Sequence, residues 1–496
     1  MAKTILTNPS RTLMEYRLLP GLTTEASAPG NISLKTTIMR SQAGGIELAV
    51  PLMSAAMQSV SGVSMAIELA KLGGVSVLFA SQTAEDQAGM VRAVKSYRAG
   101  FVSPRTVTEA TTVREVEALR ESLGYSTFPV VSDSGEFVGL VAKHDYDSIV
   151  HADLTVQSRM VAKHKLTVGE AGIALEAAHA LLLESHQGVL PIVDKSGKLV
   201  SMVFRSDIRS HLDTPAQRLD AKGRFIVFAA LNTHDYKTRA KALADAEVDG
   251  FVIDSSDGHS VFQAEAIRWL KAQLPAVPVM AGNIITAEGF TYLAEAGADA
   301  VKIGMGGGSI CITQEQKGTG RGLATAVLDV VTARDAYAAR TGTYLPVVAD
   351  GGIETARDIT TALAMGADAC MMGRYFARME ESPTEKVVVN GRVMKPYWGE
   401  GAARARHWRA QRYSQNAFVE GVEGFVDYAG KLRDNLPESL AKIRASMSSC
   451  GCPDLPAFRA NVVLELVSAL SIREGQVHDI YMPSEGTNIG SQSWGS

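Results

Sequence analysis

The chain has 496 residues, 46% of them hydrophobic, so it can bury a large core and has room for about two to four domains. A formal net charge of -4 at pH 7 argues against the broad basic surface that nucleic-acid or membrane binding requires, and favours small-molecule chemistry. Four cysteines without a CxxC pair, no apolar leader and no apolar run of about 18 residues argue against a disulfide framework, a zinc site and a membrane span, and predict a cytoplasmic protein.

Eight short apolar runs, separated by amphipathic stretches, predict successive βα units. In chain order the runs are LAVPLMSA (48–55), VSVLFA (75–80), FIVFAALN (225–232), GFVIDSS (250–256), PVMAGNI (278–284), AVKIGM (300–305), YLPVVADGG (344–352) and ACMMGRYF (369–376). Eight parallel strands indicate an α/β fold of the TIM (β/α)8 barrel type. A doubly wound Rossmann sheet is the alternative, but no strand opens into GxGxxG and no GxxxxGK[ST] loop follows one.

An internal repeat lies between the second and third runs. FPVVSDSGEFVGLVAKHD (128–145) aligns with LPIVDKSGKLVSMVFRSD (190–207) at a constant offset of 62 residues. Each copy reads as a helix, a strand, a turn and a second strand, and two such units would pack as one small domain. We therefore expect a satellite domain over 103–215, inserted into a barrel domain formed by 1–102 and 216–496.

The segment after the eighth run does not continue the pattern of apolar runs and amphipathic stretches. VVVNGRVM (387–394) predicts a hairpin with an Asn-Gly turn, and PYWGEGAARARHWRAQRYSQN (396–416) is too irregular to predict a core element. A long loop of this kind is typical of a lid. We expect a mobile flap over about 385–425.

Working residues of TIM barrels sit at the carboxyl ends of the strands. After the sixth run comes GMGGGSICITQEQKGTGRG (304–322), where glycines let the backbone approach a ligand closely and Cys311 stands alone. Cys311 is either a reactive thiolate or an ordinary loop residue. Cys370, inside a strand, predicts a structural role, and the pair Cys450 and Cys452 predicts a surface turn.

The seventh and eighth runs end in Asp350-Gly351-Gly352 and Gly373-Arg374, which together favour a phosphate site made of backbone N–H groups and a guanidinium. Asp350 could bind ribose hydroxyls, or it could cap the following helix. The same two readings apply to the polar cluster 254–257 after the fourth run. Lys302, within the sixth run, could simply plug the barrel.

The cysteine loop resembles the catalytic loop of the IMP (inosine-5′-monophosphate) dehydrogenase / GMP reductase family, and the resemblance spans nearly the whole chain. The segments that carry it, in the family's order, are SAAMQSVSG (54–62), VIDSSDGHS (252–260), AGNI (281–284), the cysteine loop, ADGGI (349–353), MMGRYFA (371–377), YWGEG (397–401) and RYS (412–414). The extended MMGRYFARMEESPT and YWGEGAARARHW segments are similar to those of protozoan-type IMP dehydrogenases. The repeat resembles a tandem cystathionine-β-synthase (CBS, Bateman) domain.

The resemblance implies NAD-dependent oxidation of IMP to xanthosine monophosphate (XMP), a step of guanine nucleotide synthesis, through a covalent adduct on Cys311. Hydrolysis of the adduct would use Arg412 and Tyr413 of the flap, with Thr313 and Glu420 as a second proton route. The implied substrate ligands are Met57, Ser309, Asp350, Gly352, Gly373, Arg374 and Tyr397, and the implied cofactor ligands are Asp254, Ser255, Ser256, Asn283 and Gly304.

The family also implies a potassium ion and a homotetramer, with octamers a further possibility. The cation would be bound by carbonyl oxygens of Gly306, Gly308 and Cys311, together with Glu474, Gly475 and Gln476 of a neighbouring subunit. Gln476 stands where the family has a glycine.

Two departures leave alternatives open. In nucleotide-binding CBS repeats a Ser or Thr precedes the ligand-binding aspartate by three residues, and here Ala142 and Phe204 precede Asp145 and Asp207. The insert is therefore either a nucleotide site or a structural satellite. The competing functions for the chain are a GMP reductase, which shares the barrel and the cysteine, and a catalytically silent nucleotide sensor.

Overall fold

The computed structural model describes residues 4–42, 44–97, 100–102, 104–123, 126–205, 208, 216–405 and 419–477. The chain divides into two compact units, one made of residues 1–95 and 216–496 and the other of residues 96–215. The second unit begins earlier than the expected residue 103, because β6 (Phe101–Val102) pairs with β13 (Leu199–Phe204) of the repeat. Arg412, Tyr413 and Asp207 lie outside the described residues.

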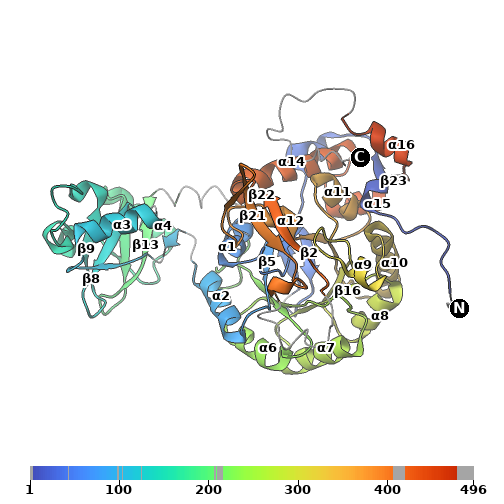
Figure 1. Ribbon diagram of the computed structural model, residues 1–496, viewed down its shortest axis with the longest axis horizontal. Helices are drawn as coiled ribbons and strands as arrows, with labels where there is room; N and C mark the ends of the chain where they lie inside the picture. The colour runs from blue at the N-terminus through green and yellow to red at the C-terminus, as the bar shows by residue number, and fades with distance from the viewer. Residues whose placement is uncertain are drawn as a thin grey trace. The chain divides into compact units, whose positions relative to one another are not determined.

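The first unit contains a closed barrel of eight parallel strands (Figure 1), which confirms the predicted TIM barrel. Each strand falls within one of the eight apolar runs. Around the barrel the order is β14 (Phe228–Leu231), β15 (Gly250–Ile253), β16 (Val279–Ile284), β17 (Ala300–Ile303), β18 (Val347–Asp350), β19 (Ala369–Met372), β4 (Leu52–Ser54) and β5 (Val75–Leu78).

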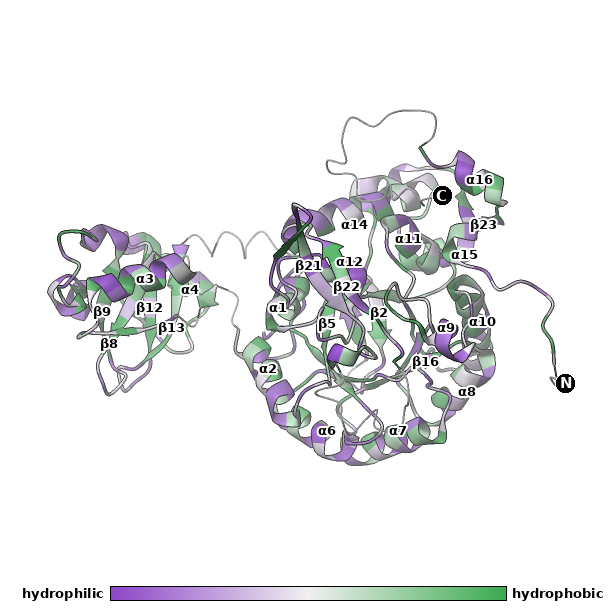
Figure 2. Cartoon of the chain, viewed as in Figure 1, coloured by the Kyte–Doolittle hydropathy of each residue, from purple (hydrophilic) through white to green (hydrophobic). Residues whose placement is uncertain are grey.

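Helices surround this barrel as an outer ring, with hydrophilic and hydrophobic residues alternating along them (Figure 2). They are α1 (Val63–Lys71), α2 (Ala84–Ser96), α6 (Tyr236–Asp245), α7 (Val261–Gln273), α8 (Ala287–Glu295), α10 (Leu323–Thr341), α11 (Ala356–Ala364) and the short α12 (Arg374–Ala377). Alternate residues of each strand point inward and fill the barrel with apolar side chains. Phe228, Val252, Met280, Val348 and Met371 belong to this interior cluster.

The amino-terminal end of the barrel is closed by a hairpin of β2 (Thr36–Met39) and β3 (Ile46–Leu48). Ile38, Met39 and Leu48 join the interior cluster. Arg40 N donates to the carbonyl of Asp299, just before β17, and the Thr36 hydroxyl donates to the carbonyl of Asp368, just before β19. With this end covered by a hairpin, the carboxyl ends of the strands are left for a site.

Two strands far apart in the sequence pair beside the barrel (Figure 1). β1 (Tyr16–Leu19) pairs with β23 (Val463–Leu466), beside α14 (Leu432–Ser449), α15 (Leu455–Asn461) and α16 (Ala469–Glu474). The prediction that Cys452 lies in a surface turn is wrong, because its side chain is 1% exposed next to α15, whereas Cys450 is partly exposed. Within the described residues, none of the helices combines the length and apolar character that crossing a bilayer requires.

The predicted Asn-Gly hairpin is present as β20 (Val387–Val389) and β21 (Arg392–Trp398), with positive φ at both Asn390 and Gly391. β21 also pairs with β22 (Glu423–Asp427). The expectation that 396–416 starts as irregular chain is wrong for its first three residues, since β21 continues to Trp398 and buries Tyr397 and Trp398. The first part of the expected flap therefore contains the strands β20 and β21.

The second unit repeats its elements at the predicted offset. α3 (Val113–Leu123), β8 (Thr127–Val131) and β9 (Phe137–Ala142) correspond to α4 (Leu175–Glu184), β12 (Val189–Val193) and β13. Two four-stranded sheets result, in the orders β10-β9-β8-β7 and β11-β12-β13-β6. The bounds of the remaining strands are β7 (Val107–Thr108), β10 (Val161–Ala162) and β11 (Gly169–Glu170).

The two copies meet through equivalent residues. Glu136 forms an antiparallel bridge with Lys198, its counterpart in the second copy. Leu140 and its counterpart Met202 lie in one buried cluster. Because equivalent residues face each other, the copies are related by an approximate twofold axis, and each buries an apolar surface that it would expose alone.

Candidate active site

The cysteine loop leaves β17 and continues into the short helix α9 (Thr313–Lys317). Cys311 is partly exposed, and its Sγ lies 3.1 Å from the hydroxyl of the buried Thr313. That hydroxyl lies 3.4 Å from a carboxylate oxygen of Glu420, which forms a 2.8 Å ion pair with Lys317. A thiol, a hydroxyl and a carboxylate thus form one chain along which a proton can move.

Backbone pairing fixes the position of Cys311. Ile312 N donates to the carbonyl of Glu420 at 3.2 Å, and Val422 N donates to the carbonyl of Ile310 at 2.9 Å. Cys311 itself bridges Gly421, where a Cβ would lie 3.2 Å from Ala402 N. The thiol is therefore held by a segment more than 100 residues later in the chain, which the sequence pattern did not reveal.

The glycine-rich loops after β17 and β18 touch each other. Gly304 has φ of 141°, and a Cβ there would lie 1.9 Å from the carbonyl oxygen of Asp350. Gly352 has φ of 67°, and its Cβ would lie 3.3 Å from the carbonyl oxygen of Gly307. Larger residues would separate these loops, so glycine is required for the cysteine to approach the groups that follow β18.

A second cluster gathers four of the expected substrate ligands. A Cβ on Gly373 would lie 2.7 Å from the Tyr397 hydroxyl and 3.0 Å from the Met57 sulfur. Tyr397 is hydrogen-bonded to Ser309, and burial raises the pKa of its hydroxyl above the ordinary value. The hydroxyl is therefore neutral and able to donate to a phosphate oxygen. Arg374, at the start of α12, pairs with the carboxylate of Glu354 at 3.3 Å.

Lys302 is the important residue that the sequence reasoning underestimated. It fills the barrel as expected, being 1% exposed, but its ammonium also contacts Asp350 at 2.8 Å, Asp254 at 3.4 Å and the side-chain oxygen of Asn283. Asn283 in turn donates to Asp350 at 2.9 Å. Burial lowers the pKa of Lys302, but the carboxylates of Asp350 and Asp254 outweigh it and the pKa is raised. Lys302 is therefore charged, and it joins an expected ribose ligand to two expected cofactor ligands.

The helix-capping readings of the strand-end aspartates are wrong. α7 is capped by Ser260, whose hydroxyl accepts from Gln263 N, and α11 is capped by Thr355, whose hydroxyl accepts from Asp358 N. Neither Asp254 nor Asp350 acts as the cap of the helix that follows it. Asn283 N donates to the carbonyl of Ser255 at 2.8 Å, and Ser256 is exposed beside it.

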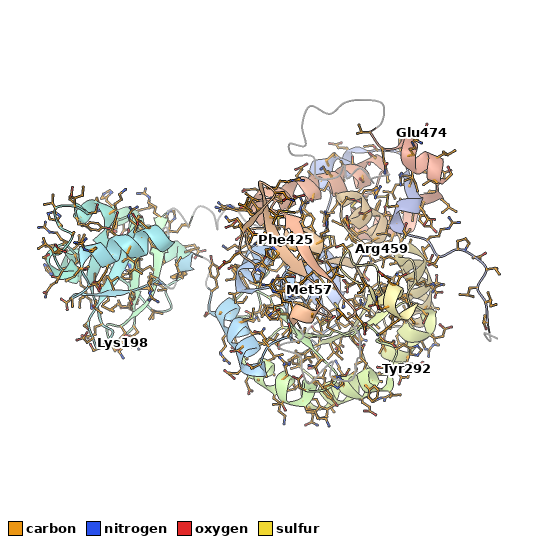
Figure 3. The ribbon with its side chains drawn as sticks, viewed as in Figure 1. Met57, Lys198, Tyr292, Phe425, Arg459 and Glu474 are labelled. Atoms are coloured by element: carbon orange, nitrogen blue, oxygen red, sulfur yellow. The ribbon has the colours of Figure 1, made fainter. Side chains whose placement is uncertain are left out.

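The expected cation ligands fall into two groups within this one chain. Gly306 and Gly308 lie in the cysteine loop, where the carbonyl of Gly308 accepts from Cys311 N at 3.0 Å. Glu474 ends α16 and Gly475 and Gln476 follow it. Figure 3 labels Glu474 at the periphery of the barrel unit and Met57 over its middle.

The fold and these contacts define a class of protein: a (β/α)8-barrel enzyme with a cysteine loop at the carboxyl ends of its strands, at the same barrel end as the cluster around Lys302. The protein-family model described as "IMP dehydrogenase / GMP reductase domain" matches residues 10–478 of the sequence. The chain belongs to the IMP dehydrogenase / GMP reductase family. This confirms the resemblance drawn from the motifs.

Proteins of similar sequence and structure belong to the same family. The chain is 46% identical over 486 residues to inosine-5′-monophosphate dehydrogenase of Tritrichomonas foetus, covering 95% of this chain and 96% of the relative. It is 35% identical over 469 residues to the enzyme of the same name from Escherichia coli K12, covering 93% and 94%. A crystal structure of a GMP reductase variant from Trypanosoma brucei with guanosine 5′-monophosphate has a TM-score of 0.81 at 28% identity, covering 96% of this chain and 98% of that chain.

Proposed function

We propose that the chain is an NAD-dependent IMP dehydrogenase, which oxidises IMP to XMP for guanine nucleotide synthesis. One observation carries the proposal: the chain Cys311–Thr313–Glu420 lies at the same barrel end as Asp350 and the cluster of Gly373 and Tyr397. A purine nucleotide with its phosphate at Tyr397 and Arg374 and its ribose at Asp350 would present its base to Met57 and the thiol. Ser309 and Gly352 would complete the phosphate site.

In the first half-reaction the Cys311 thiolate forms a bond to C2 of hypoxanthine, and the hydrogen on C2 leaves as hydride. NAD, when bound, accepts this hydride. The thiol proton passes to the Thr313 hydroxyl and the Glu420 carboxylate, which lie within reach of the sulfur. In the second half-reaction water adds to C2, the sulfur–carbon bond breaks, and XMP is released.

The residues at the ends of β15 and β16 suit the cofactor. The cap of α7 is not Asp254, Ser255 or Ser256. The backbone N–H of Asn283 donates to the Ser255 carbonyl, and its side-chain amide donates to Asp350. Asp254 would accept from a ribose hydroxyl of the cofactor, while Gly304 leaves room where the two ligands meet. Lys302 contacts both of the carboxylates proposed to bind ribose, so one buried cation would orient the groups that bind both ligands.

Activation of water is assigned to Arg412 and Tyr413, with Thr313 and Glu420 as the second proton route. A variant Arg412→Ala should still give a first burst of reduced cofactor, because the thiol chemistry is intact, and then stall before hydrolysis. Stopped-flow absorbance at the reduced-nicotinamide band measures both phases. Normal steady-state turnover in this variant would refute the role.

A potassium ion would be bound by the carbonyl oxygens of Gly306, Gly308 and Cys311, completed by Glu474, Gly475 and Gln476 of a second copy. Glu474 lies at the periphery of its own barrel unit (Figure 3), which favours a cation site whose ligands come from two subunits of a homotetramer. Tetramers could pair into octamers through a further interface. The four cysteines are free thiols, in keeping with the reducing cytoplasm.

GMP reductase is the second candidate, because a GMP reductase structure superposes over 96% of the chain. Purified protein should be given IMP, NAD and potassium in one mixture and GMP with NADPH in another, and the nicotinamide absorbance followed. We expect turnover in the first. Turnover only in the second would establish the reductase, and silence in both would leave a nucleotide sensor.

A further inference from the structure

Lys395 is a buried lysine outside the reaction chemistry described above. Its side chain is 1% exposed on β21. Its ammonium donates to three backbone carbonyls, those of Met379 at 2.8 Å, Ser382 at 3.0 Å and Glu380 at 3.2 Å. An ammonium has three N–H donors, so each one has an acceptor. A buried charge is costly unless it is satisfied in this way, which makes the contact a specific one.

This contact joins the two elements that carry the phosphate ligands. Segment 379–382 begins two residues after the end of α12, which starts with Arg374 and is preceded by Gly373. Tyr397 lies two residues after Lys395 on β21, so the two side chains point to the same face of the strand. The Tyr397 hydroxyl is next to Gly373 and bonded to Ser309. The ammonium therefore ties the strand of Tyr397 to the helix of Arg374.

We propose that Lys395 is a positioning residue for the substrate phosphate, which fixes β21 against the end of α12 so that Tyr397 and Arg374 converge on one anion. This rests on the proposed function, in which these two residues bind the phosphate of IMP. Lys395 does not itself touch the substrate. Its loss should weaken recognition of the phosphate and leave the chemistry at Cys311 unchanged.

The charge state of Lys395 gives the proposal a pH signature. Burial lowers the pKa of Lys395 to about 8, although Glu380 and Glu381 oppose this shift and Lys386 adds to it. The ammonium is the form that satisfies three carbonyls, so the contact is complete well below pH 8 and is lost as pH rises through that value. Affinity for a phosphate-bearing ligand should fall over the same range.

The experiment compares IMP with inosine, which has the same base and ribose but no phosphate. Dissociation constants are measured by calorimetry, and hydride transfer by single-turnover absorbance, for wild type, Lys395→Met, Lys395→Arg and the exposed control Lys386→Met. We expect Lys395→Met to weaken IMP binding about tenfold or more, leave inosine binding within about twofold and keep the saturated hydride-transfer rate within about threefold. Lys386→Met should match wild type.

If Lys395→Met lowers the melting temperature while the ratio of IMP to inosine affinity stays at the wild-type value, the lysine is merely structural and the proposal is overturned. If that variant does not fold, the wild-type protein decides. IMP affinity should fall relative to inosine between pH 7.5 and 9.5, and not in Lys395→Arg, whose guanidinium keeps its proton. A flat ratio in wild type overturns the proposal. Absence of any IMP oxidation by wild type would instead count against the proposed function.

Discussion

Two aspartates at strand ends of the barrel, Asp254 and Asp350, and two aspartates of the inserted repeat, Asp145 and Asp194, are used in different ways. In the barrel, Ser260 and Thr355 cap the helices after β15 and β18, and the aspartates of those strand ends converge on Lys302. In the repeat, Asp194 accepts from three donors of its own turn, and Asp145 accepts from Ala142 N at 2.7 Å. A polar residue is available to a ligand where another residue has taken over the local structural work.

Substituting the nucleophile should have the largest effect. Cys311→Ala removes the only thiol in the cysteine loop, so no bond to C2 can form, and IMP oxidation should fall by about 10⁴-fold or more. Cys450→Ala is the matched control, since that thiol is also partly exposed but lies beside Leu19, and it should keep wild-type rates. Single-turnover absorbance, with mass spectrometry of the quenched enzyme, gives both the rate and the adduct. Residual oxidation by Cys311→Ala above about 1% of wild type would break the assignment.

Removing the buried positive charge of Lys302 should have the next largest effect. Lys302→Met keeps the volume of the side chain but leaves two carboxylates facing each other in the barrel, at a cost of about 3–5 kcal/mol. We expect kcat/KM for IMP to fall by about 10²–10³-fold, and KM to rise for both IMP and NAD because each loses an oriented carboxylate. Steady-state kinetics with each ligand varied measures this. A variant in which one KM alone changed would show that the cation does not couple the two ligand sites.

The strands of the barrel could be predicted from sequence because each lies in a short apolar run that local pattern defines. The repeat was predictable because its two copies share a sequence, and its helices and strands recur at the same offset. The glycine-rich loop at a strand end made Cys311 a candidate, but its local pattern fitted an ordinary loop residue equally well, and only the resemblance to the family implied a nucleophile. The apolar runs are local signals, readable within about 20 residues, whereas the repeat is found by comparing two segments at a fixed offset.

What could not be predicted depends on contacts between distant segments. The role of Lys302 needs Asp254, Asn283 and Asp350, which come from three other strands, and nothing in its own run reveals them. The burial of Cys452 depends on the packing of α15, although its CGC sequence is typical of a turn. The extension of β21 to Trp398 depends on pairing with β22.

The apolar interface within the repeat tests whether the insert is separate from the chemistry. Met202→Ala opens a cavity where the two copies meet and should destabilise that unit by about 2–4 kcal/mol. Catalytic constants for IMP and NAD should stay within about twofold of wild type, since the site is built from barrel loops. Thermal unfolding and kinetics at 25 °C are compared. Loss of activity below the unfolding temperature of the unit would show that the barrel depends on the insert.

The smallest expected effect concerns the aspartate of the first copy. Asp145→Ala removes the acceptor of Ala142 N and should cost about 1 kcal/mol, like the loss of a helix cap. Because the carboxylate is already bound to its own backbone, we expect calorimetric titration with purine nucleotides to be the same for wild type and variant. Asp194→Ala is the matched control in a turn of the second copy.

A different result would be informative in a specific way. If wild type bound a purine nucleotide and Asp145→Ala lost that binding while Asp194→Ala kept it, the Ala142 N–H bond would be one that the carboxylate exchanges for a ribose hydroxyl. The contrast between barrel and insert would then hold for Asp194 alone. Ala142 supplies no hydroxyl beside this carboxylate, and Phe204 packs against the buried cluster shared by the two copies, so the side chains here favour the structural outcome.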